Sequence, residues 1–196
     1  MYASHHMTAK QRSEAVAERI LRKWPWHAPP HFENGANLYL LTAACWQHRP
    51  LLTAPYRRDE WQTIIFAMER ALSAELRAWV IMPTHYHVLA RVDLESFRTW
   101  IGRQHNGAAT RWNREDSTPG RKVWYRFADR RIRSERHFRT ALNYIHANPV
   151  KHGFAVKAQE WEWSSVHAYA RDVGLSQLRD WWKTYPVLDF GKDWDE

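Results

Sequence analysis

Two histidines separated by one residue are the first candidates for chemistry in this sequence. His85 and His87 lie within residues 82–92, where apolar and polar side chains alternate after Pro83. This alternation predicts a β-strand, on which residues two apart share a face. The two imidazoles would then point the same way and make half of a metal site. The alternative interpretation is a pair of satisfied sheet histidines, because His-x-His alone is a weak pattern.

A helix predicted from Ser134 to about Asn148 supplies the other candidate side chains. Tyr144 and Asn148 are four residues apart and therefore share one flank of that helix. The Asn148 carbonyl oxygen and the two histidines can hold a divalent cation that polarises a phosphate, and the Tyr144 phenol can attack it to form a covalent phosphotyrosine. The alternative is a core tyrosine and an asparagine that only caps the helix.

A dense run of arginines precedes this helix and predicts a DNA-binding track. Its members are Arg126, Arg130, Arg131, Arg133, Arg136 and Arg139. Arginine pairs with phosphate through its planar fork, and the interleaved aromatics Trp124, Tyr125 and Phe127 offer surfaces on which unpaired bases stack. The alternative is a solvated basic face.

Composition agrees with a nucleic-acid partner. The 196 residues include 29 Lys and Arg against 21 Asp and Glu, a net charge of +8, and 13 Trp. A basic balance favours phosphate-rich partners, although net charge alone indicates only non-specific attraction. The length and the 44% hydrophobic fraction suit one domain with appendages.

Cysteine usage and hydropathy bear on the cellular compartment. Cys45 is the one cysteine, so an intrachain disulfide and a cysteine-based zinc site are both excluded. No apolar run approaches the roughly 18 residues of a membrane span, and no signal-peptide pattern opens the sequence. The expected location is the cytoplasm.

The hydrophobic patterns predict the following elements: strand 38–44, helix 59–75 capped by Asp59, strands 77–82 and 85–92, helix 94–112, strand 123–132 and helix 134–148, ended by Pro149. This β-α-β-β-α-β order is typical of an α+β, ferredoxin-like antiparallel sheet with two helices on one face. The helix that carries Tyr144 is additional and covers another part of the sheet.

The predicted organisation has three parts. Residues 1–30 form a polar N-terminal arm, residues 31–153 the catalytic domain, and residues 154–196 a helical, Trp-rich tail packed on that domain. Within the tail, Ser164 and Ser165 are expected to cap a short helix that runs to about Val173.

Three motifs resemble those of a known family. Met-Pro-Thr-His-Tyr-His-Val-Leu (82–89) resembles the His-hydrophobic-His motif of the single-tyrosine transposases of insertion sequences. Asn-Tyr-Ile-His-Ala-Asn-Pro-Val-Lys-His-Gly (143–153), with the later Trp-Glu-Trp-Ser-Ser (161–165), resembles more closely the REP-associated tyrosine transposases. The resemblance runs from about residue 30 to the end of the chain.

The resemblance implies a role for each candidate residue. His85 and His87 match the metal-binding histidines, and Tyr144 matches the catalytic tyrosine. Asn148 stands where the family places a third polar ligand, often glutamine in the insertion-sequence enzymes. The metal would be Mg²⁺ or Mn²⁺. Tyr86, on the opposite strand face, is expected to have no chemical role.

The resemblance also implies a substrate and a reaction. The substrate would be single-stranded DNA hairpins of repetitive extragenic palindromes (REP), cleaved and transferred through a 5′-phosphotyrosine link in the bacterial nucleoid. No nucleotide cofactor and no membrane are expected. The alternatives are a hairpin-binding module with weak or no activity, and a metal nuclease that uses water. The long tail favours a monomer over a dimer that exchanges the tyrosine helix.

Overall fold

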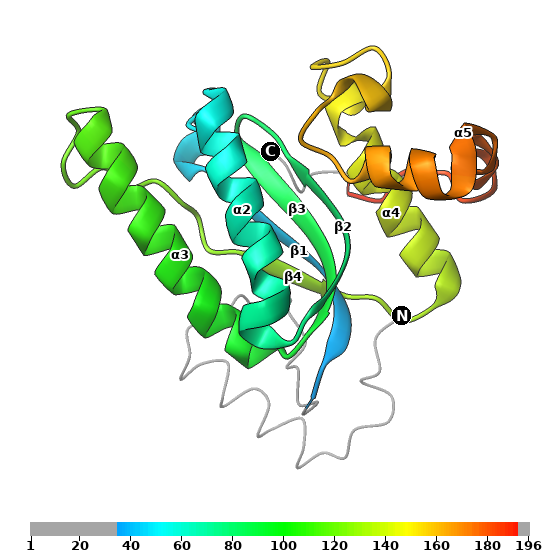
Figure 1. Cartoon of the computed structure of the whole chain (residues 1–196), viewed down its shortest axis with the longest axis horizontal. Coiled ribbons are helices and arrows are strands. Elements are labelled where there is room, and N and C mark those ends of the chain that lie inside the picture. The colour runs from blue at the N-terminus through cyan, green and yellow to red at the C-terminus, as the bar shows by residue number, and fades with distance from the viewer. Residues whose placement is uncertain (1–34, 192–196) are drawn as a thin grey trace. The chain divides into compact units, whose positions relative to one another are not determined.

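The computed structural model describes residues 35–191 (Figure 1); the predicted N-terminal arm lies outside them. Its strands are β1 (Asn37–Ala44), β2 (Glu75–Ile81), β3 (His85–Val92) and β4 (Ala128–Arg131). Its helices are α2 (Pro55–Leu72), α3 (Leu94–Glu115), α4 (Glu135–Lys151) and α5 (Val166–Thr184), with 3-10 turns η2 (Trp46–His48) and η3 (Ala158–Glu160). The sheet order is β2-β3-β1-β4, and every neighbouring pair is antiparallel. The ferredoxin-like prediction is confirmed.

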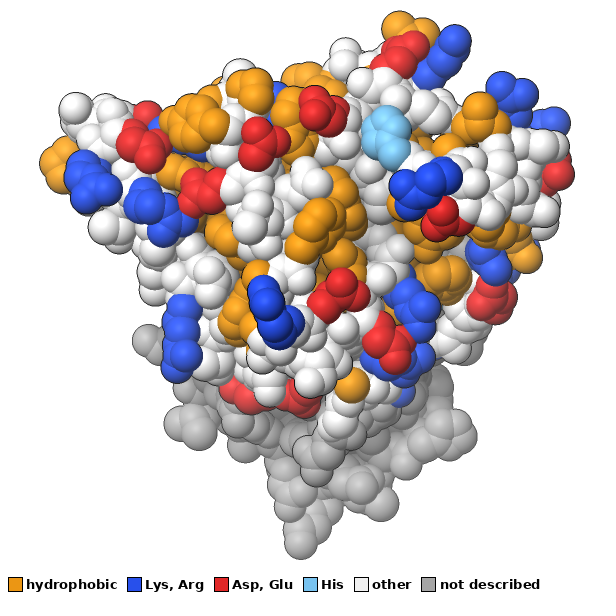
Figure 2. Space-filling view, in the orientation of Figure 1, with side chains coloured by type: hydrophobic (Ala, Val, Ile, Leu, Met, Phe, Trp, Pro, Cys, Tyr) orange, Lys and Arg blue, Asp and Glu red, His pale blue; other side chains and the backbone are white. Residues whose placement is uncertain are grey.

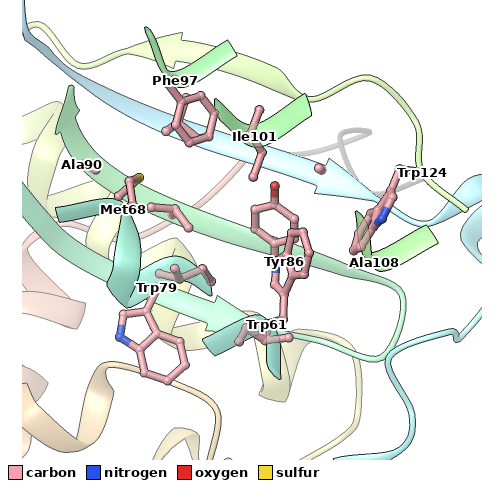
Figure 3. Packing of buried hydrophobic residues seen from close by; sticks show 14 of the residues in the cluster. Trp61, Met68, Trp79, Tyr86, Ala90, Phe97, Ile101, Ala108 and Trp124 are labelled. Carbon is pink, nitrogen blue, oxygen red and sulfur yellow. The ribbon is translucent and has the colours of Figure 1, made fainter. Parts of the chain in front are cut away.

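The sheet separates two layers of helices. Helices α2 and α3 cover one face and α4 lies against the other (Figure 1). Alternation along β3 assigns its side chains to these layers, since Tyr86 packs with Trp61 and Trp124 beneath α2 and α3 (Figure 3), whereas Leu89 packs with Leu142 of α4. Residues 85 and 87 therefore face α4, as the period-two pattern predicts.

Helix α2 begins earlier than predicted. Its first residue is Pro55, and Ala54 is the N-cap, in extended conformation. Proline suits the first helical position, where its missing N–H would have no intrahelical partner. The prediction that Asp59 is the N-cap is therefore wrong; Asp59 lies inside the helix, and its carboxylate accepts a hydrogen bond from Trp163 Nε1 at 2.8 Å. The helix ends at Leu72, where Ser73 adopts a left-handed conformation.

Helix α4 continues past the proline that was predicted to end it. Ser134 caps the helix as predicted, accepting a hydrogen bond from the His137 amide, but the helix runs through Pro149 to Lys151. Helical conformation is disfavoured for a residue before proline, not forbidden. Here Asn148 is fully buried, and its side chain is bonded to the sheet, so tertiary contacts override the local preference.

Two further boundaries differ from the predictions. Strand β4 is much shorter than residues 123–132, because Val123 and Trp124 turn into the core, where Trp124 makes only an isolated bridge to Cys45. Helix α5 does not stop at residue 173 but resumes after a break at Gly174, whose φ of 83° is left-handed. Within residues 35–191, no helix combines the length and apolarity needed to cross a membrane.

Candidate active site

The four predicted site residues converge on the α4 face of the sheet. The ring centroids of His85 and His87 are 4.9 Å apart, and that of His87 is 5.0 Å from the Tyr144 ring. One helical turn beyond Tyr144, the Asn148 Oδ1 atom accepts a hydrogen bond from His85 Nε2 at 2.9 Å. At least 98% of each side chain is shielded from solvent, with exposures of 2%, 0%, 1% and 0% for residues 85, 87, 144 and 148. Strand alternation and helical spacing bring together groups about sixty residues apart in sequence.

Threonine hydroxyls fix the orientation of both imidazoles. Thr42 Oγ1 is 2.7 Å from His87 Nδ1, and Thr84 Oγ1 is 2.9 Å from His85 Nδ1. A partner on one ring nitrogen sets which nitrogen serves as a metal ligand. In both histidines the nitrogen left for a metal would be Nε2, which in His85 is directed at Asn148 Oδ1.

This set of donors fits a divalent cation. His85 Nε2 and Asn148 Oδ1 lie 2.9 Å apart, so both donor atoms would face one bound ion. A bound cation would replace the proton that now joins these two atoms. Two imidazoles and an amide oxygen suit Mn²⁺ at least as well as Mg²⁺, which prefers an all-oxygen set. Within residues 35–191, no cluster of three or more His, Cys, Asp or Glu side chains could hold a metal.

The end of the described chain covers Tyr144. The Phe190 ring lies 5.5 Å from the Tyr144 ring, centroid to centroid. Gly191 approaches so closely that an added Cβ would lie 2.2 Å from Tyr144 Cε2, and its φ of +79° is also a glycine conformation. Lys151 Nζ donates a hydrogen bond to the Gly191 carbonyl at 3.4 Å and lies 5.3 Å from the centre of the tyrosine ring. For Tyr144 to reach a phosphate, this cover, residues 185–191, must move.

Sequence reasoning missed four residues around the site. Lys151 is the last residue of α4, two turns beyond Tyr144, and His152 is the C-cap of that helix, with its ring 5.1 Å from that of His85. Helical spacing alone would have found both. Thr84 adjoins the histidine motif, but Thr42 is placed only by the register that pairs β1 with β3, for which no local pattern exists.

The six arginines do not form one continuous track. In β4, Arg130 pairs with Leu40 and Arg131 with Tyr39. Leu40 packs on the α4 face and Tyr39 on the other, so the two arginines belong to opposite faces of the sheet. Arg131 also donates to Asn37 Oδ1 at 3.0 Å.

Arg130 and Arg133 lie near the cover of the tyrosine. Burial lowers the pKa of His137, and the charges of these two arginines lower it further. The His137 ring is 5.6 Å from Phe190. This part of the predicted track therefore adjoins the candidate site.

The remaining arginines are placed differently. Arg139 donates to Glu135 at 2.7 Å and lies over the Trp181 ring at 4.1 Å, so it serves the packing of α5 on α4. Arg126 and Arg136 are exposed. On the face shown in Figure 2, basic and acidic side chains are interspersed, so that face is not a single-sign surface.

Of the three aromatics predicted to stack bases, two are committed to packing. Trp124 is 8% exposed and lies in the core with Trp61 (Figure 3), so its prediction as a stacking surface is wrong. Phe127 packs edge-on against Phe97 at 5.2 Å. Only Tyr125 is half-buried without entering the core cluster.

Other buried polar groups have structural roles. Burial lowers the pKa values of His105 and His146 to about 3, so both rings are neutral at physiological pH. His105 Nε2 is hydrogen-bonded to the Tyr86 hydroxyl at 3.0 Å, and His146 Nε2 to the Ser165 hydroxyl at 3.0 Å. Burial also raises the pKa of Cys45 to about 12, which keeps the thiol protonated and unreactive.

Known proteins resemble this chain in sequence and in fold. No protein-family model matches the chain. A REP-associated tyrosine transposase of Escherichia coli (strain K12) is 32% identical over 139 residues, which cover 67% of this chain and 75% of the relative. A Haemophilus influenzae protein, provisionally given the same name, is 28% identical over 130 residues, covering 61% of this chain and 72% of the relative.

A solved structure described as a REP-associated tyrosine transposase bound to a REP hairpin has the same fold. It superposes with a TM-score of 0.57 at 23% identity and covers 76% of this chain and 86% of that one. Together with the extent of the match to the Escherichia coli relative, the histidine strand and the tyrosine helix lead to one assignment. The chain belongs to the REP-associated tyrosine transposases, a family of DNA-cleaving and DNA-joining enzymes.

Proposed function

We propose that this chain cleaves single-stranded DNA at REP-type hairpins and transfers the cut strand through a covalent 5′-phosphotyrosine on Tyr144. His85, His87 and Asn148 would hold Mg²⁺ or Mn²⁺. The observation that carries the proposal is the meeting of β3 and α4. There, the Tyr144 ring lies 5.0 Å from that of His87, and Asn148 Oδ1 lies 2.9 Å from His85 Nε2.

The tyrosine performs the covalent step. Tyr144 Oη attacks phosphorus as the bond from phosphorus to the 3′ oxygen breaks, giving a 5′-phosphotyrosine and a DNA end with a free 3′ hydroxyl. The phenol gives up its proton and the departing 3′ oxygen gains one, so the step is balanced. Strand transfer is the reverse reaction with a different 3′ hydroxyl. When bound, the metal supplies Lewis-acid stabilisation of the charge that develops on the phosphate.

The protein contributes position and charge. Thr42 and Thr84 hold the imidazoles in place, and Lys151 brings a cation to within 5.3 Å of the Tyr144 ring centre, where it favours a developing phenolate. Arg130 and Arg133 are suited to phosphates that flank the cut.

Hairpin DNA is the substrate supported best. The structural neighbour is described as bound to a REP hairpin, and its fold matches this chain at a TM-score of 0.57. The net charge of +8 favours a polyanion. Because the substrate is chromosomal, the activity is proposed for the bacterial nucleoid.

Trapping the covalent intermediate tests the proposal. A labelled REP hairpin with single-stranded flanks, taken from the genome that encodes the chain, is incubated with protein and Mn²⁺ or Mg²⁺. A denaturing gel then separates the products, and mass spectrometry locates any attached nucleotide. The expected result is an adduct on Tyr144 that chelation abolishes. Cleavage with no adduct on a rapid-quench time scale would identify water as the nucleophile and overturn the proposal.

The burial of Tyr144 favours a second candidate, a hairpin-binding module with little or no cleavage. At 1% exposure, the phenol cannot contact DNA unless residues 185–191 move. Tight hairpin binding with neither cleavage nor adduct, in wild type and in variants that uncover Tyr144, would establish this second function.

A further inference from the structure

An aromatic group outside the core lies at the histidine end of the sheet. Ala44, the last residue of β1, pairs with His85, and the next amide, that of Cys45, donates to the Thr84 carbonyl at 2.7 Å. Beyond it, the Trp46 amide donates to the Val123 carbonyl at 2.7 Å. In the same network the Tyr125 amide donates to the Ala44 carbonyl at 2.9 Å. These bonds fix residues 46 and 125 beside the strand end that carries His85.

Three rings and a cation form a compact unit there. The centroids of Trp46 and Tyr125 are 4.5 Å apart, and the His48 ring is 5.9 Å from that of Tyr125. Lys122 Nζ lies 3.4 Å from the centre of the Trp46 ring. The three rings are half-buried and Lys122 is exposed. We call this set, Trp46, His48, Lys122 and Tyr125, the Trp46 platform.

The platform is distinct from the hydrophobic core that it adjoins. Cys45 and Trp124, the neighbours in sequence of Trp46 and Tyr125, are both buried within the cluster under α2 and α3. Residues 42 and 44 of β1 pair with His87 and His85 and share their face of the sheet, whereas Cys45 packs in that cluster. Trp46 follows β1 in the 3-10 turn η2, and its amide and that of Tyr125 are bonded beside the strand end at which β3 begins with His85. The Trp46 platform therefore lies at the end of the sheet that carries His85.

The turn that presents the platform is strained. Gln47 and His48 both have positive φ values, 56° and 49°, in a segment without glycine. Such conformations cost about 1–3 kcal/mol each, and they persist at sites where a ligand is held.

We propose that the Trp46 platform stacks an unpaired nucleotide of the DNA strand beside the scissile phosphate, an inference that rests on the proposed function. Stacking on an aromatic side chain is worth about 1–3 kcal/mol per base and tolerates any sequence. The cation–π contact that Lys122 now makes with Trp46 is worth about 0.5–1 kcal/mol at an exposed site. An arriving base therefore displaces the ammonium group, which then neutralises the phosphate of the same nucleotide, and the exposed Arg126 is suited to the next phosphate along.

Binding to matched oligonucleotides tests the inference. Two fluorescent hairpins share one REP stem; one carries a single-stranded flank and the other ends flush. Trp46→Ala and Tyr125→Ala are expected to lower affinity for the flanked hairpin about tenfold, the loss of one stacked base, and to leave affinity for the flush hairpin within about twofold. Trp46→Phe should retain most of the affinity. Phe66→Ala, which removes a 45% exposed ring on α2, is the matched control and should bind both hairpins as wild type does.

The outcomes separate this inference from the proposed function. Unchanged affinity of both alanine variants for the flanked hairpin would overturn the platform, even if wild type forms the Tyr144 adduct. Equal loss of affinity for both hairpins would also overturn it, because the effect would not depend on unpaired bases. A selective loss with no adduct in wild type would support the platform and reject covalent catalysis.

Discussion

The two faces of the sheet use the same residue types for opposite purposes. Under α2 and α3, Tyr86 and His105 hydrogen-bond to each other at 3.0 Å, and the His105 ring stacks on Trp124 at 4.5 Å. Under α4, the rings of His87 and Tyr144 lie 5.0 Å apart, centroid to centroid, and His87 Nδ1 is 2.7 Å from Thr42 Oγ1. In the first pair the histidine is hydrogen-bonded to the tyrosine, whereas in the second the histidine is hydrogen-bonded to a threonine.

This difference separates packing from chemistry. The Tyr86 hydroxyl is committed to His105, and burial raises its pKa well above the ordinary value, so it is a poor nucleophile. On the α4 face, threonine hydroxyls are bonded to Nδ1 of both imidazoles, and His85 Nε2 donates to Asn148 Oδ1 a proton that a bound cation would replace. Residue type therefore does not identify an active site; the partner of each polar atom does.

The largest expected effect comes from removing one hydroxyl on each face. Tyr144→Phe should abolish the covalent adduct on the hairpin gel, because it removes the phenol whose ring lies 5.0 Å from that of His87. Tyr86→Phe should keep the adduct rate within about twofold and lower the free energy of unfolding by about 1–3 kcal/mol, since His105 loses its buried partner. An adduct that persists in Tyr144→Phe would reject the division of roles between the faces.

The next largest effect on the adduct rate is expected when one histidine from each face is replaced by alanine. His87→Ala and His105→Ala each remove a buried ring and should destabilise the fold by about 2–4 kcal/mol, measured by denaturant unfolding. At a temperature where both remain folded, only His87→Ala should lower the adduct rate, by at least about a hundredfold. Hairpin affinity should survive in both, because arginine–phosphate contacts dominate binding. Equal adduct rates in the two variants would remove His87 from the metal site.

Removing a threonine hydroxyl should weaken Mn²⁺ binding only where that hydroxyl is bonded to a histidine of the candidate site. Thr42→Val removes the hydroxyl bonded to His87 and should weaken Mn²⁺ binding about 10–100-fold, as read by calorimetry. The matched control is Thr63→Val on α2, whose hydroxyl bonds only the Asp59 carbonyl of its own helix. If the two variants bind Mn²⁺ equally, Thr42 has no part in orienting the ligand.

Loosening the cover of Tyr144 is expected to raise the adduct rate, by less than the previous substitutions lower it. Gly191→Ala places a methyl group against the tyrosine ring and should raise the adduct rate about 5–10-fold, which corresponds to about 1 kcal/mol of destabilised closure. Gly120→Ala is a close control, because its φ is also +79° but nothing lies within 4 Å of the added carbon. A slower rate in Gly191→Ala than in Gly120→Ala would show that closure assists the reaction.

The last prediction concerns the stability of the fold in acid, to which one buried histidine on each side of the sheet contributes. His105 and His146, one on each side of the sheet, have folded-state pKa values of about 3 against an ordinary 6.5. The unfolded chain therefore binds more protons between pH 3 and 6.5, and stability falls as pH drops through that window. At pH 5 the loss is about 2 kcal/mol for each histidine relative to pH 7. His105→Gln should make the dependence of the denaturation midpoint on pH shallower; an unchanged slope would contradict the assigned burial.

The sequence predicted what depends on local periodicity and missed what depends on register. The alternation over residues 85–92 and the four-residue spacing of Tyr144 and Asn148 sufficed to bring the site together. The prediction that α2 begins at Asp59 is wrong because Pro55 occupies the first helical position. Thr42 is brought to His87 only by the pairing of β1 with β3, and the Trp46 platform is assembled by contacts between residues 46–48 and 122–125, which no short window of sequence contains.

Asn143 determines which part of the chain must move to expose the Tyr144 hydroxyl. Its amide nitrogen donates to the carbonyls of Trp181 and Tyr185, at 2.9 and 2.8 Å, and so pins the end of α5 to the helix turn that bears Tyr144. Five residues separate this pin from Gly191, and the six peptide units from Tyr185 to Gly191 extend to about 20 Å at most. The part of the cover beyond Tyr185 can therefore move away while α5 stays docked, and loop motions of this kind take nanoseconds to microseconds, far less than unfolding. The cover would set the fraction of molecules ready to react, and it would not limit how fast a bound hairpin finds the tyrosine.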